Sequence, residues 1–336
     1  MIDRFRLSAL TLLGTLALAL TAPAYAADNG WFRGFCDSGT GVYRWTDGNR
    51  YEGQCQNNFL HGQGTLTLTN GDRYVGRFSN DAKNGRGTYY FANDDRYEGT
   101  FKDGSRNGPG TFYRANGERY MGTYTNDQKA GQGTYYFLTG DTYAGNWIGD
   151  QFNGQGVYSF VNGDRYEGQW KNGEQNGRGK FTWANGSSYD GMFQNSLRAG
   201  LGTFEWANSN RYTGQWRNGK QHGQGTKYWA NGDRYEGQWQ NNKMNGLGEF
   251  FYANGNRFEG VFSNDELNGD GTYFFANGDR YVGPWLRGQR DGPGMYYDSR
   301  GNSQAMEFRG GSKVYKELGS KLIPGLKDQI NNRETY

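Results

Sequence analysis

Short segments in which aromatic residues alternate with polar residues or glycine recur along almost the whole chain. RYEGQW at 165–170 and GTYYFA at 87–92 are examples. They are rich in Tyr, Phe, Trp and Thr and are bounded by Gly and Asn, which is typical of half-buried β-strands. None of these segments has a helical period. The pattern therefore predicts an all-β chain of many short strands.

The alternating pattern has a fixed period. The nonapeptide NGDRYEGQW occurs at 162–170 and again at 231–239, a separation of 69 positions, which is three times 23. An internal period of this length indicates a repeat architecture. Stepping by 23 from Tyr51 to Tyr281 meets an aromatic residue each time, with a glycine two residues later and no insertion or deletion.

Each repeat carries further fixed positions. A second aromatic residue stands four places after the leading one, except where Cys55 replaces it, and two glycines follow eleven and thirteen places after the leading residue, as at Gly62 and Gly64. We count twelve 23-residue units over 28–303. A degenerate repeat follows from Gln304 to about residue 310.

The Asn-Gly pair between consecutive strands indicates a hairpin turn. A two-residue Asn-Gly turn would divide the aromatic residues between both faces of the sheet. A three-residue Ala-Asn-Gly loop, with Gly in the left-handed conformation, instead places the leading Tyr166 on the face that carries Tyr158 and Phe160 of the preceding strand. We favour this register because a slip by one residue would send half the rings to the other face.

In this register one face carries rings packed over glycines, and the other face is polar. Arginine and glutamate lie two residues apart on five strands of the polar face. These pairs are Arg50 with Glu52, Arg96 with Glu98, Arg165 with Glu167, Arg234 with Glu236, and Arg257 with Glu259. Exposed ion pairs of this kind each contribute only about 0–1 kcal/mol. We interpret them as a solvated face, and a binding stripe of arginines is the alternative.

Twelve hairpins joined edge to edge predict an elongated single-layer antiparallel sheet of about 24 strands, roughly 4.8 Å apart. Such a layer leaves its aromatic face in need of cover. Val314, Leu318 and Leu322 lie four residues apart, and Leu326 and Ile330 continue this spacing after Pro324. Residues 304–336 are therefore expected to form the degenerate repeat and a short C-terminal helical cap, with a partner-recognition helix as the alternative.

Residues 1–26 have the pattern of a cleaved signal peptide. Arg4 and Arg6 precede an apolar run over 7–20, and Ala24-Tyr25-Ala26 forms a small-x-small end. The run is too short for a typical spanning helix, although a retained membrane anchor is the alternative. We expect a mature chain that begins near Ala27 and is exported to the periplasm or the extracellular space.

Composition and charge fit an exported repeat array. The chain has 57 glycines and 17% aromatic residues, which is too aromatic for a disordered Gly-rich protein. The formal net charge is +3, and no run of basic residues is present. Nucleic acid is therefore excluded as an expected partner.

The unit Tyr-Glu-Gly-x-Trp-x-Asn-Gly-x-x-x-Gly-x-Gly, as in YEGQWKNGEQNGRG at 166–179, closely resembles the MORN repeat family. The resemblance covers 28–303 and implies a MORN solenoid, here in an exported, bacterial-type member. The family includes lipid kinases, a SET-domain histone methyltransferase, membrane-junction proteins and cytoskeletal scaffolds. In its enzymes a separate domain carries the chemistry, and we find no such domain in this sequence.

The two cysteines interrupt the pattern at adjacent strands. Cys55 takes the place of a second ring, and in the chosen register it faces Gly39, three residues beyond Cys36. A disulfide between Cys36 and Cys55 is therefore predicted, worth roughly 3 kcal/mol in the loop-entropy model. Two buried or free thiols are the alternative.

No catalytic constellation is evident. His61 and His222 occupy the same place in their repeats, where other repeats carry residues such as Asn84 and Ala130, so both are interpreted as loop variation. Asp94 and Asp95 replace the usual Asn-Gly and are interpreted as a turn variant. The Gly-x-Gly motifs do not lead from a strand into a helix, so a phosphate loop is excluded. The sequence predicts a non-enzyme with no cofactor, catalytic residue or metal ligand.

Two classes of function remain. The first is a scaffold that binds a protein partner or forms a homodimer. The second is a surface that binds glycans through an aromatic groove, or anionic lipid headgroups through a basic edge, although lipid binding usually shows clustered Lys and Arg. The candidate groove residues are aromatic residues late in the preceding strand, namely Phe160, Trp183, Trp206 and Trp229.

Overall fold

The computed structural model describes residues 30–31 and 36–314. They fall into two compact units, unit 1 ending at Gln221 and unit 2 starting at His222. Every regular element within the described ranges is a β-strand, and none of these residues forms a helix long and apolar enough to cross a membrane. The predicted signal peptide (1–26) lies outside the described residues, as does the predicted helical cap beyond Val314.

The strands have nearly constant lengths. Those of unit 1 are β1 (Gly30–Trp31), β2 (Ser38–Arg44), β3 (Arg50–Gln56), β4 (Phe59–Thr67), β5 (Arg73–Ser79), β6 (Ala82–Tyr90), β7 (Arg96–Lys102), β8 (Ser105–Tyr113), β9 (Arg119–Thr125), β10 (Gln128–Tyr136), β11 (Thr142–Ile148), β12 (Gln151–Ser159), β13 (Arg165–Lys171), β14 (Glu174–Thr182), β15 (Ser188–Gln194), β16 (Leu197–Glu205) and β17 (Arg211–Arg217). The boundary between the units falls within β18 (Lys220–Tyr228). Unit 2 continues with β19 (Arg234–Gln240), β20 (Lys243–Phe251), β21 (Arg257–Ser263), β22 (Glu266–Phe274), β23 (Arg280–Leu286), β24 (Gln289–Arg290), β25 (Gly292–Tyr297), β26 (Ser303–Arg309) and β27 (Ser312–Lys313).

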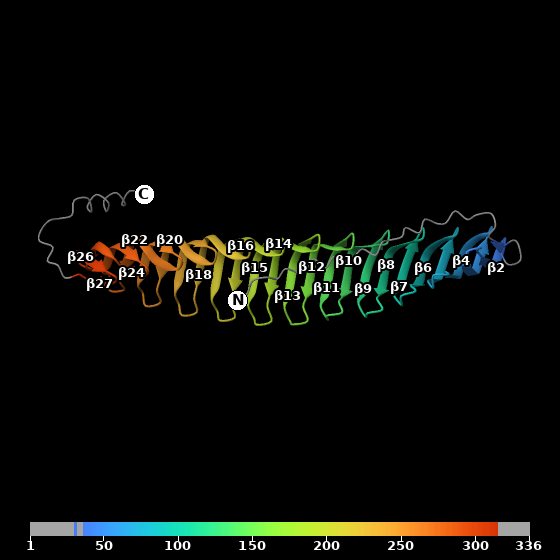
Figure 1. Cartoon of the computed structure of the whole chain (residues 1–336), viewed down its shortest axis with the longest axis horizontal. Coiled ribbons are helices and arrows are strands. Elements are labelled where there is room, and N and C mark those ends of the chain that lie inside the picture. Colours follow the sequence, from blue (N-terminus) through green and yellow to red (C-terminus); the bar gives the residue numbers. More distant parts are fainter. Residues whose placement is uncertain (1–29, 32–35, 315–336) are drawn as a thin grey trace. The chain divides into compact units, whose positions relative to one another are not determined.

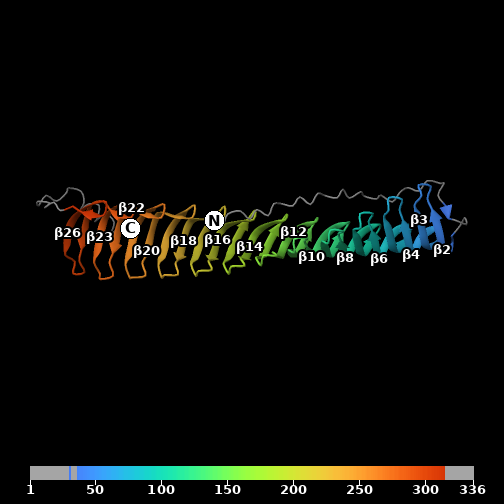
Figure 2. The same ribbon diagram turned by 60° about the horizontal axis from the view of Figure 1, so that its bottom comes forward.

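Within each unit the strands pair antiparallel with their neighbours along the chain. In unit 1 this holds from β1–β2 through β16–β17, and in unit 2 from β18–β19 to β26–β27, except that β25 pairs with β23 and not with the short strand β24. Figure 1 and Figure 2 show, from two sides, that the strands of each unit follow one another in chain order as one layer. Each unit is thus an open antiparallel sheet, which confirms the all-β, single-layer prediction.

Consecutive repeats are joined by three-residue loops, as between β12 and β13. Phe160 donates its N–H to the carbonyl oxygen of Asp164 at 2.9 Å, and Gly163 donates to the carbonyl oxygen of Phe160 at 3.0 Å. Residues 161–163 form the loop, and Gly163 has a φ of 92°, in the left-handed region that glycine adopts without cost. The predicted loop geometry is confirmed.

The register that follows from this loop is also the predicted one. Tyr166 lies opposite Tyr158, and Gly168 lies opposite Gly156. Side chains alternate between the faces of a strand, so the leading ring, the second ring and the paired glycines share one face. We call it the ring face, and the opposite side the polar face.

Within a repeat the two strands are joined by a tighter turn and a bulge. Residues 172–173 form a two-residue turn with φ values of 50° and 83°. Trp170 then pairs with Gln175, but Gly168 pairs with Gly179, so β14 carries two extra residues between these pairs. The same irregularity recurs in the other repeats, for example between β3 and β4. The sequence pattern did not predict this bulge.

The core of a typical repeat is a tyrosine ring lying over two glycines. Tyr166 is fully buried, and its hydroxyl donates a hydrogen bond to the carbonyl oxygen of Gln169 at 2.9 Å. A Cβ on Gly179 would lie only 2.6 Å from two carbons of this ring. Trp170 packs edge-on against Tyr166, with ring centres 5.1 Å apart, and its indole N–H donates to the carbonyl oxygen of Gly156 at 3.2 Å. Glycine is therefore required here by close approach.

Leading and second rings form what we call the inner ring row. Leading rings contact the second ring of their own repeat and that of the next, as Tyr143 contacts Trp147 at 5.3 Å and Trp170 at 5.4 Å. Edge-to-face pairs of this kind add about 0.5–1.5 kcal/mol beyond area burial. The buried members are Tyr51, Tyr74, Phe78, Tyr97, Phe101, Tyr120, Tyr124, Tyr143, Trp147, Tyr166, Trp170, Tyr189, Phe193, Tyr212 and Trp216 in unit 1, and Tyr235, Trp239, Phe258, Phe262, Tyr281 and Trp285 in unit 2.

Side-chain carboxylates tie several turns to a neighbouring repeat. Asp72 accepts hydrogen bonds from the Ala92 N–H at 2.8 Å and from the Tyr89 hydroxyl at 2.7 Å. At the other end of the strands, Asp127 accepts the Arg106 N–H at 2.9 Å. These bonds satisfy backbone donors that the sheet ladder leaves unpaired.

The two ends of the array also follow the predicted pattern. Strand β26 pairs with β25, and Phe308 contacts Tyr281 at 5.4 Å between ring centres, so the degenerate repeat extends the inner ring row. At the other end, Cys55 lies opposite Gly39, and a disulfide joins it to Cys36 across a Cα–Cα distance of 6.1 Å. The predicted disulfide is confirmed.

Candidate binding surface

The predicted groove residues belong to a second set of rings on the ring face. They stand seventeen residues after the leading ring, where the strand enters the three-residue loop. We call this set the outer ring row. Its members are Phe91, Phe137, Phe160, Trp183 and Trp206 in unit 1, and Trp229, Tyr252 and Phe275 in unit 2. All eight are half-buried, in contrast to the inner ring row.

Outer rings rest on what we call a middle ring, the aromatic residue two places earlier, and reach the middle ring of the next repeat. Lys227 takes the middle place in the repeat of Trp229. Trp183 lies 4.5 Å from Phe181 and 5.0 Å from Phe204, measured between ring centres. Phe160 makes the corresponding contacts with Tyr158 at 4.5 Å and Phe181 at 5.8 Å. The structure thus joins three of the four predicted residues, Phe160, Trp183 and Trp206, in one run of rings within unit 1.

Trp229 begins the corresponding run in unit 2. It lies 5.3 Å from Phe250 and has the Lys227 ammonium group 4.8 Å above its ring. The rings of both runs combine an apolar body with partial exposure. Aromatic side chains of this kind supply much of the binding energy at protein interfaces and stack on flat ligands. The binding role of these residues stays a prediction.

The polar face carries the predicted ion pairs. Arg96 lies 3.0 Å from Glu98, Arg165 pairs with Glu167 at 2.6 Å, and the other three pairs also form. The side chains of these pairs are about one third to three fifths exposed, so each ion pair contributes little stability.

Arginines of the polar face also stack on rings, which the sequence analysis missed. The guanidinium carbon of Arg96 lies 4.5 Å from the ring centre of Tyr113, and Arg119 lies 4.3 Å from that of Tyr136. Similar stacks join Arg73 with Tyr90, Arg234 with Phe251, Arg257 with Phe274, and Arg280 with Tyr297. The sequence did carry a signal for these stacks. An aromatic residue stands sixteen places after the leading ring, and the strand register places it directly opposite the arginine.

A hollow of about 730 Å³ lies on the polar face of unit 1, between β4 and β9. Backbone glycines form part of its lining, and threonines at 88, 100, 111 and 123 line it as well. It is separate from the predicted groove residues, which lie on the opposite face.

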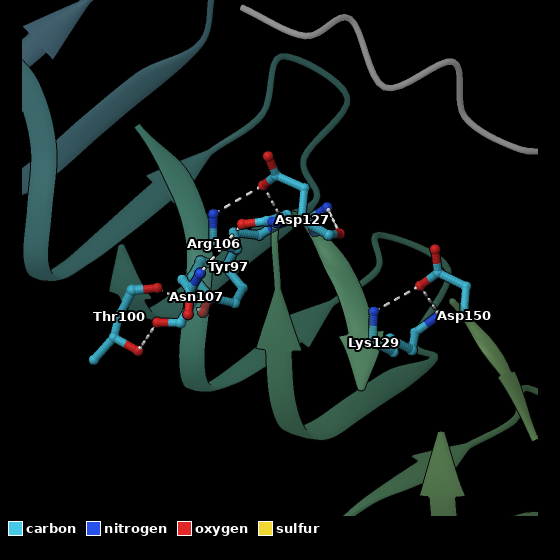
Figure 3. Close-up of polar contacts among 8 residues, drawn as sticks. Tyr97, Thr100, Arg106, Asn107, Asp127, Lys129 and Asp150 are labelled. Atoms are coloured by element: carbon cyan, nitrogen blue, oxygen red, sulfur yellow. Dashed lines mark hydrogen bonds and ion pairs between the residues drawn. The ribbon is translucent and has the colours of Figure 1, made fainter. Parts of the chain in front are cut away.

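Three successive repeats of unit 1 place a cation on the ring face, nine residues after the leading ring. These are Lys83, Arg106 and Lys129, and each lies over several rings. Burial lowers the pKa of Lys129, against the opposing effect of Asp150. Figure 3 shows Arg106 paired with Asp127 and Lys129 paired with Asp150. The sequence analysis missed these cations because it did not place this position on a strand.

The histidines and the acidic pair that the sequence singled out lie in strands and turns of the repeats. His61 is in β4 and His222 in β18, so the interpretation of both as loop residues was wrong. Asp94 has a φ of 65° and takes the place of the loop glycine, as the turn-variant interpretation requires. Within residues 30–31 and 36–314, no three His, Cys, Asp or Glu side chains gather closely enough to hold a metal ion.

A family model described as the MORN repeat matches twelve consecutive segments of the chain. The matched residues are 30–50, 51–73, 74–96, 97–119, 120–142, 143–165, 166–188, 189–211, 212–234, 235–257, 258–280 and 281–303. They coincide with the repeats predicted from the sequence, apart from the first two residues of the first repeat. No curated protein matches the chain.

Similar solved structures include the SAS-4 (dCPAP) TCP domain of Drosophila melanogaster in complex with a proline rich motif of Ana2 (dSTIL). It is 13% identical, with 51% of this chain and 94% of that chain covered and a TM-score of 0.31. The G-box domain of the microcephaly protein CPAP is 8% identical, with 67% and 100% covered and a TM-score of 0.22. A streptogramin B lyase is 11% identical, with 75% and 84% covered and a TM-score of 0.15. Scores this low support no conclusion about function.

Proposed function

The chain belongs to the MORN repeat family, and from this premise we propose that it is a non-catalytic repeat scaffold that binds a protein partner or a second copy of itself through the outer ring row. The observation that carries the proposal is the contrast in burial on one face. The inner ring row is buried, whereas Phe160, Trp183 and Trp206 remain half-buried. Partly exposed aromatic rings in a row offer anchors that a partner can desolvate.

Substitution of one tryptophan of the outer ring row tests the proposed partner surface. Trp206→Ala removes an outer ring, and Tyr136→Ala removes a ring from the polar face as a matched control. We expect wild type and Tyr136→Ala to capture the same protein from an envelope fraction, or to show the same self-association by sedimentation. Trp206→Ala should weaken that binding about tenfold or more. Equal binding by all three would contradict the proposal.

We also propose an exported, oxidising compartment, periplasmic or extracellular. The Cys36–Cys55 disulfide supports this, since structural disulfides persist in such compartments and are rare in the cytosol. Mass spectrometry of the native protein without reductant should find this pair joined, and N-terminal sequencing should begin near Ala27. Two free thiols and a chain that starts at Met1 would contradict the proposal.

A second candidate is glycan binding by the same rings. Trp183 and Trp206 lie one repeat apart in unit 1, which corresponds to about 10 Å across two strands, and indole rings stack well on sugars. Anionic lipid is less favoured because arginines of the polar face are paired with glutamates. Sedimentation with insoluble polysaccharide and with anionic liposomes, using the Trp206→Ala variant, separates these ligands from a protein partner.

A further inference from the structure

Lys83 lies among three rings on the ring face of unit 1. Its ammonium nitrogen is 4.6 Å from the ring centre of Tyr89, 5.4 Å from that of Phe101 and 5.8 Å from that of Tyr74. Rings of the inner row and a middle ring therefore surround a cation. The next two repeats carry Arg106 and Lys129 in the same place.

Those two neighbours are each held by an internal carboxylate. The carboxylate of Asp127 accepts two hydrogen bonds from Arg106, one from the backbone N–H at 2.9 Å and one from Nε at 3.0 Å. Asp150 accepts the Lys129 N–H at 2.9 Å and lies 3.7 Å from its ammonium nitrogen. In both repeats the acid stands 21 residues after the cation, in the two-residue turn of the following hairpin (Figure 3).

The repeat that contains Lys83 lacks the acid at the corresponding turn position. Gly104 occupies the turn position that Asp127 and Asp150 take in the following repeats. Within the described part of the chain, Lys83 makes neither the ion pair nor the backbone N–H bond to a carboxylate that its neighbours make. A Cβ built on Gly104 would meet no atom within 4 Å, so the place beside Lys83 has room for another group.

We propose that the position formed by Lys83 and Gly104 binds a carboxylate of a protein partner, from an Asp or Glu side chain or a C-terminus. The ligand carboxylate would stand where Asp127 stands beside Arg106, accepting from the Lys83 ammonium and its backbone N–H. Charge-assisted hydrogen bonds of this kind are stronger than neutral ones, and the surrounding rings reduce screening by water. That the carboxylate comes from a protein partner rests on the proposed function, whereas the binding of a carboxylate at Lys83 does not.

The electrostatics of the position agree with this assignment. Burial, the largest cause, and the nearby Arg106 together lower the pKa of Lys83 to about 8, against the opposing effects of Asp127 and Asp72. A carboxylate beside the amine would favour its charged form. The ligand would therefore offset part of the cost of burying this cation.

The test measures how fast Lys83 is acetylated in the full protein. An N-hydroxysuccinimidyl ester is used near neutral pH at low conversion, and peptide mapping reports each lysine. We expect labelling of Lys83 to be about threefold slower in ~0.1 M sodium acetate than in sodium chloride of equal ionic strength, as for a dissociation constant near 0.05 M. Lys129, which has its own carboxylate, should label at the same rate in both salts.

Gly104→Asp is the matched control. The chain already places Asp at this turn position with positive φ at Asp81, Asp127 and Asp150, so the variant is expected to fold. Its internal carboxylate should slow Lys83 labelling and abolish the dependence on acetate. A wild-type rate that is equal in both salts would overturn the proposal, and so would an equal acetate effect in the variant or at Lys129.

Two peptides separate the sources of the carboxylate. One has an internal Glu and an amidated C-terminus, and the other has a free C-terminus and no acidic side chain. Protection by either supports the corresponding protein source, whereas protection by acetate and by neither peptide overturns a protein source. A Lys83→Gln variant that captures the partner as wild type does would also overturn it, and would leave the role proposed for the outer ring row intact.

Discussion

The inner and outer ring rows lie on the same face and consist of the same residue types, yet only the rings of the inner row are buried. Trp170 is 2% exposed, edge-on to Tyr166 and hydrogen-bonded to a carbonyl oxygen, whereas Trp206 is half-buried beside its turn. The difference lies beneath the rings: paired glycines let the inner rings sink onto the backbone. Rings that pack over glycine therefore stabilise the fold, whereas rings without glycine beneath them stay accessible to a binding partner.

The largest expected effect is the loss of an inner ring. Trp170→Ala should lower the free energy of unfolding by about 3–5 kcal/mol, because it truncates a buried aromatic side chain that contacts two repeats. Urea unfolding followed by circular dichroism measures this loss. A loss below about 1 kcal/mol would break the distinction between the rows.

Adding one methyl group beneath an inner ring should have the next largest effect. Gly179→Ala places a Cβ 2.6 Å from carbons of the Tyr166 ring, and overpacking of this kind costs about 1–3 kcal/mol. The same unfolding experiment checks it. A variant as stable as wild type would show that the ring can shift without cost.

Burial of Lys83 between the inner and middle rings should make the stability of the protein depend on pH. Its pKa of about 8 in the folded chain is lower than the 10.5 of a free lysine, so the folded state binds fewer protons between these values. The free energy of unfolding should therefore gain about 2–3 kcal/mol from this group as the pH rises from about 8 to 10.5. Lys83→Met should remove this gain and be more stable near pH 7. Parallel pH profiles of stability for wild type and variant would contradict this.

Removing one hydroxyl from the inner row sharpens the comparison further. Tyr166→Phe loses the hydrogen bond to Gln169 and should cost about 0.5–1.5 kcal/mol. The chain itself has Phe258 at this place in another repeat, buried to the same degree. Phe258→Tyr is the reciprocal variant and should be neutral or stabilising. Thermal melts that show no difference would mean that the hydroxyl bond adds nothing.

The smallest expected effect is the loss of an outer ring. Trp206→Ala should cost about 1 kcal/mol or less of stability, because the ring is half-buried and the turn beneath it is held by backbone hydrogen bonds. Chemical unfolding beside the Trp170→Ala variant measures it. Equal, large losses for both tryptophans would remove the outer row as a binding surface and leave the polar face and the ends of the array as candidates.

The sequence predicted the strands, the loop register and both faces because a strict 23-residue period fixes them together. Tyr166, Gly168 and Trp170 had to share a face once the three-residue loop was chosen, and the Cys36–Cys55 disulfide followed from the same register. One correct loop geometry thus determined most of the fold.

The features that the sequence did not predict depend on the bulge and on neighbouring repeats. The two extra residues on the second strand of each repeat place Lys83 and its equivalents opposite a second ring, and they bring His61 into a strand. Likewise, the stack of Arg96 on Tyr113 depends on pairing between two strands. Periodicity along one strand does not contain this information.

Hydroxyl-radical footprinting read by mass spectrometry tests the central claim most directly, because it compares the two rows in one sample. We expect Trp183, Trp206 and Trp229 to be oxidised several-fold faster than the inner tryptophans Trp147, Trp170, Trp216 and Trp239. Addition of the captured partner should protect the outer three. Equal oxidation of both rows, or protection confined to the polar face, would contradict the account.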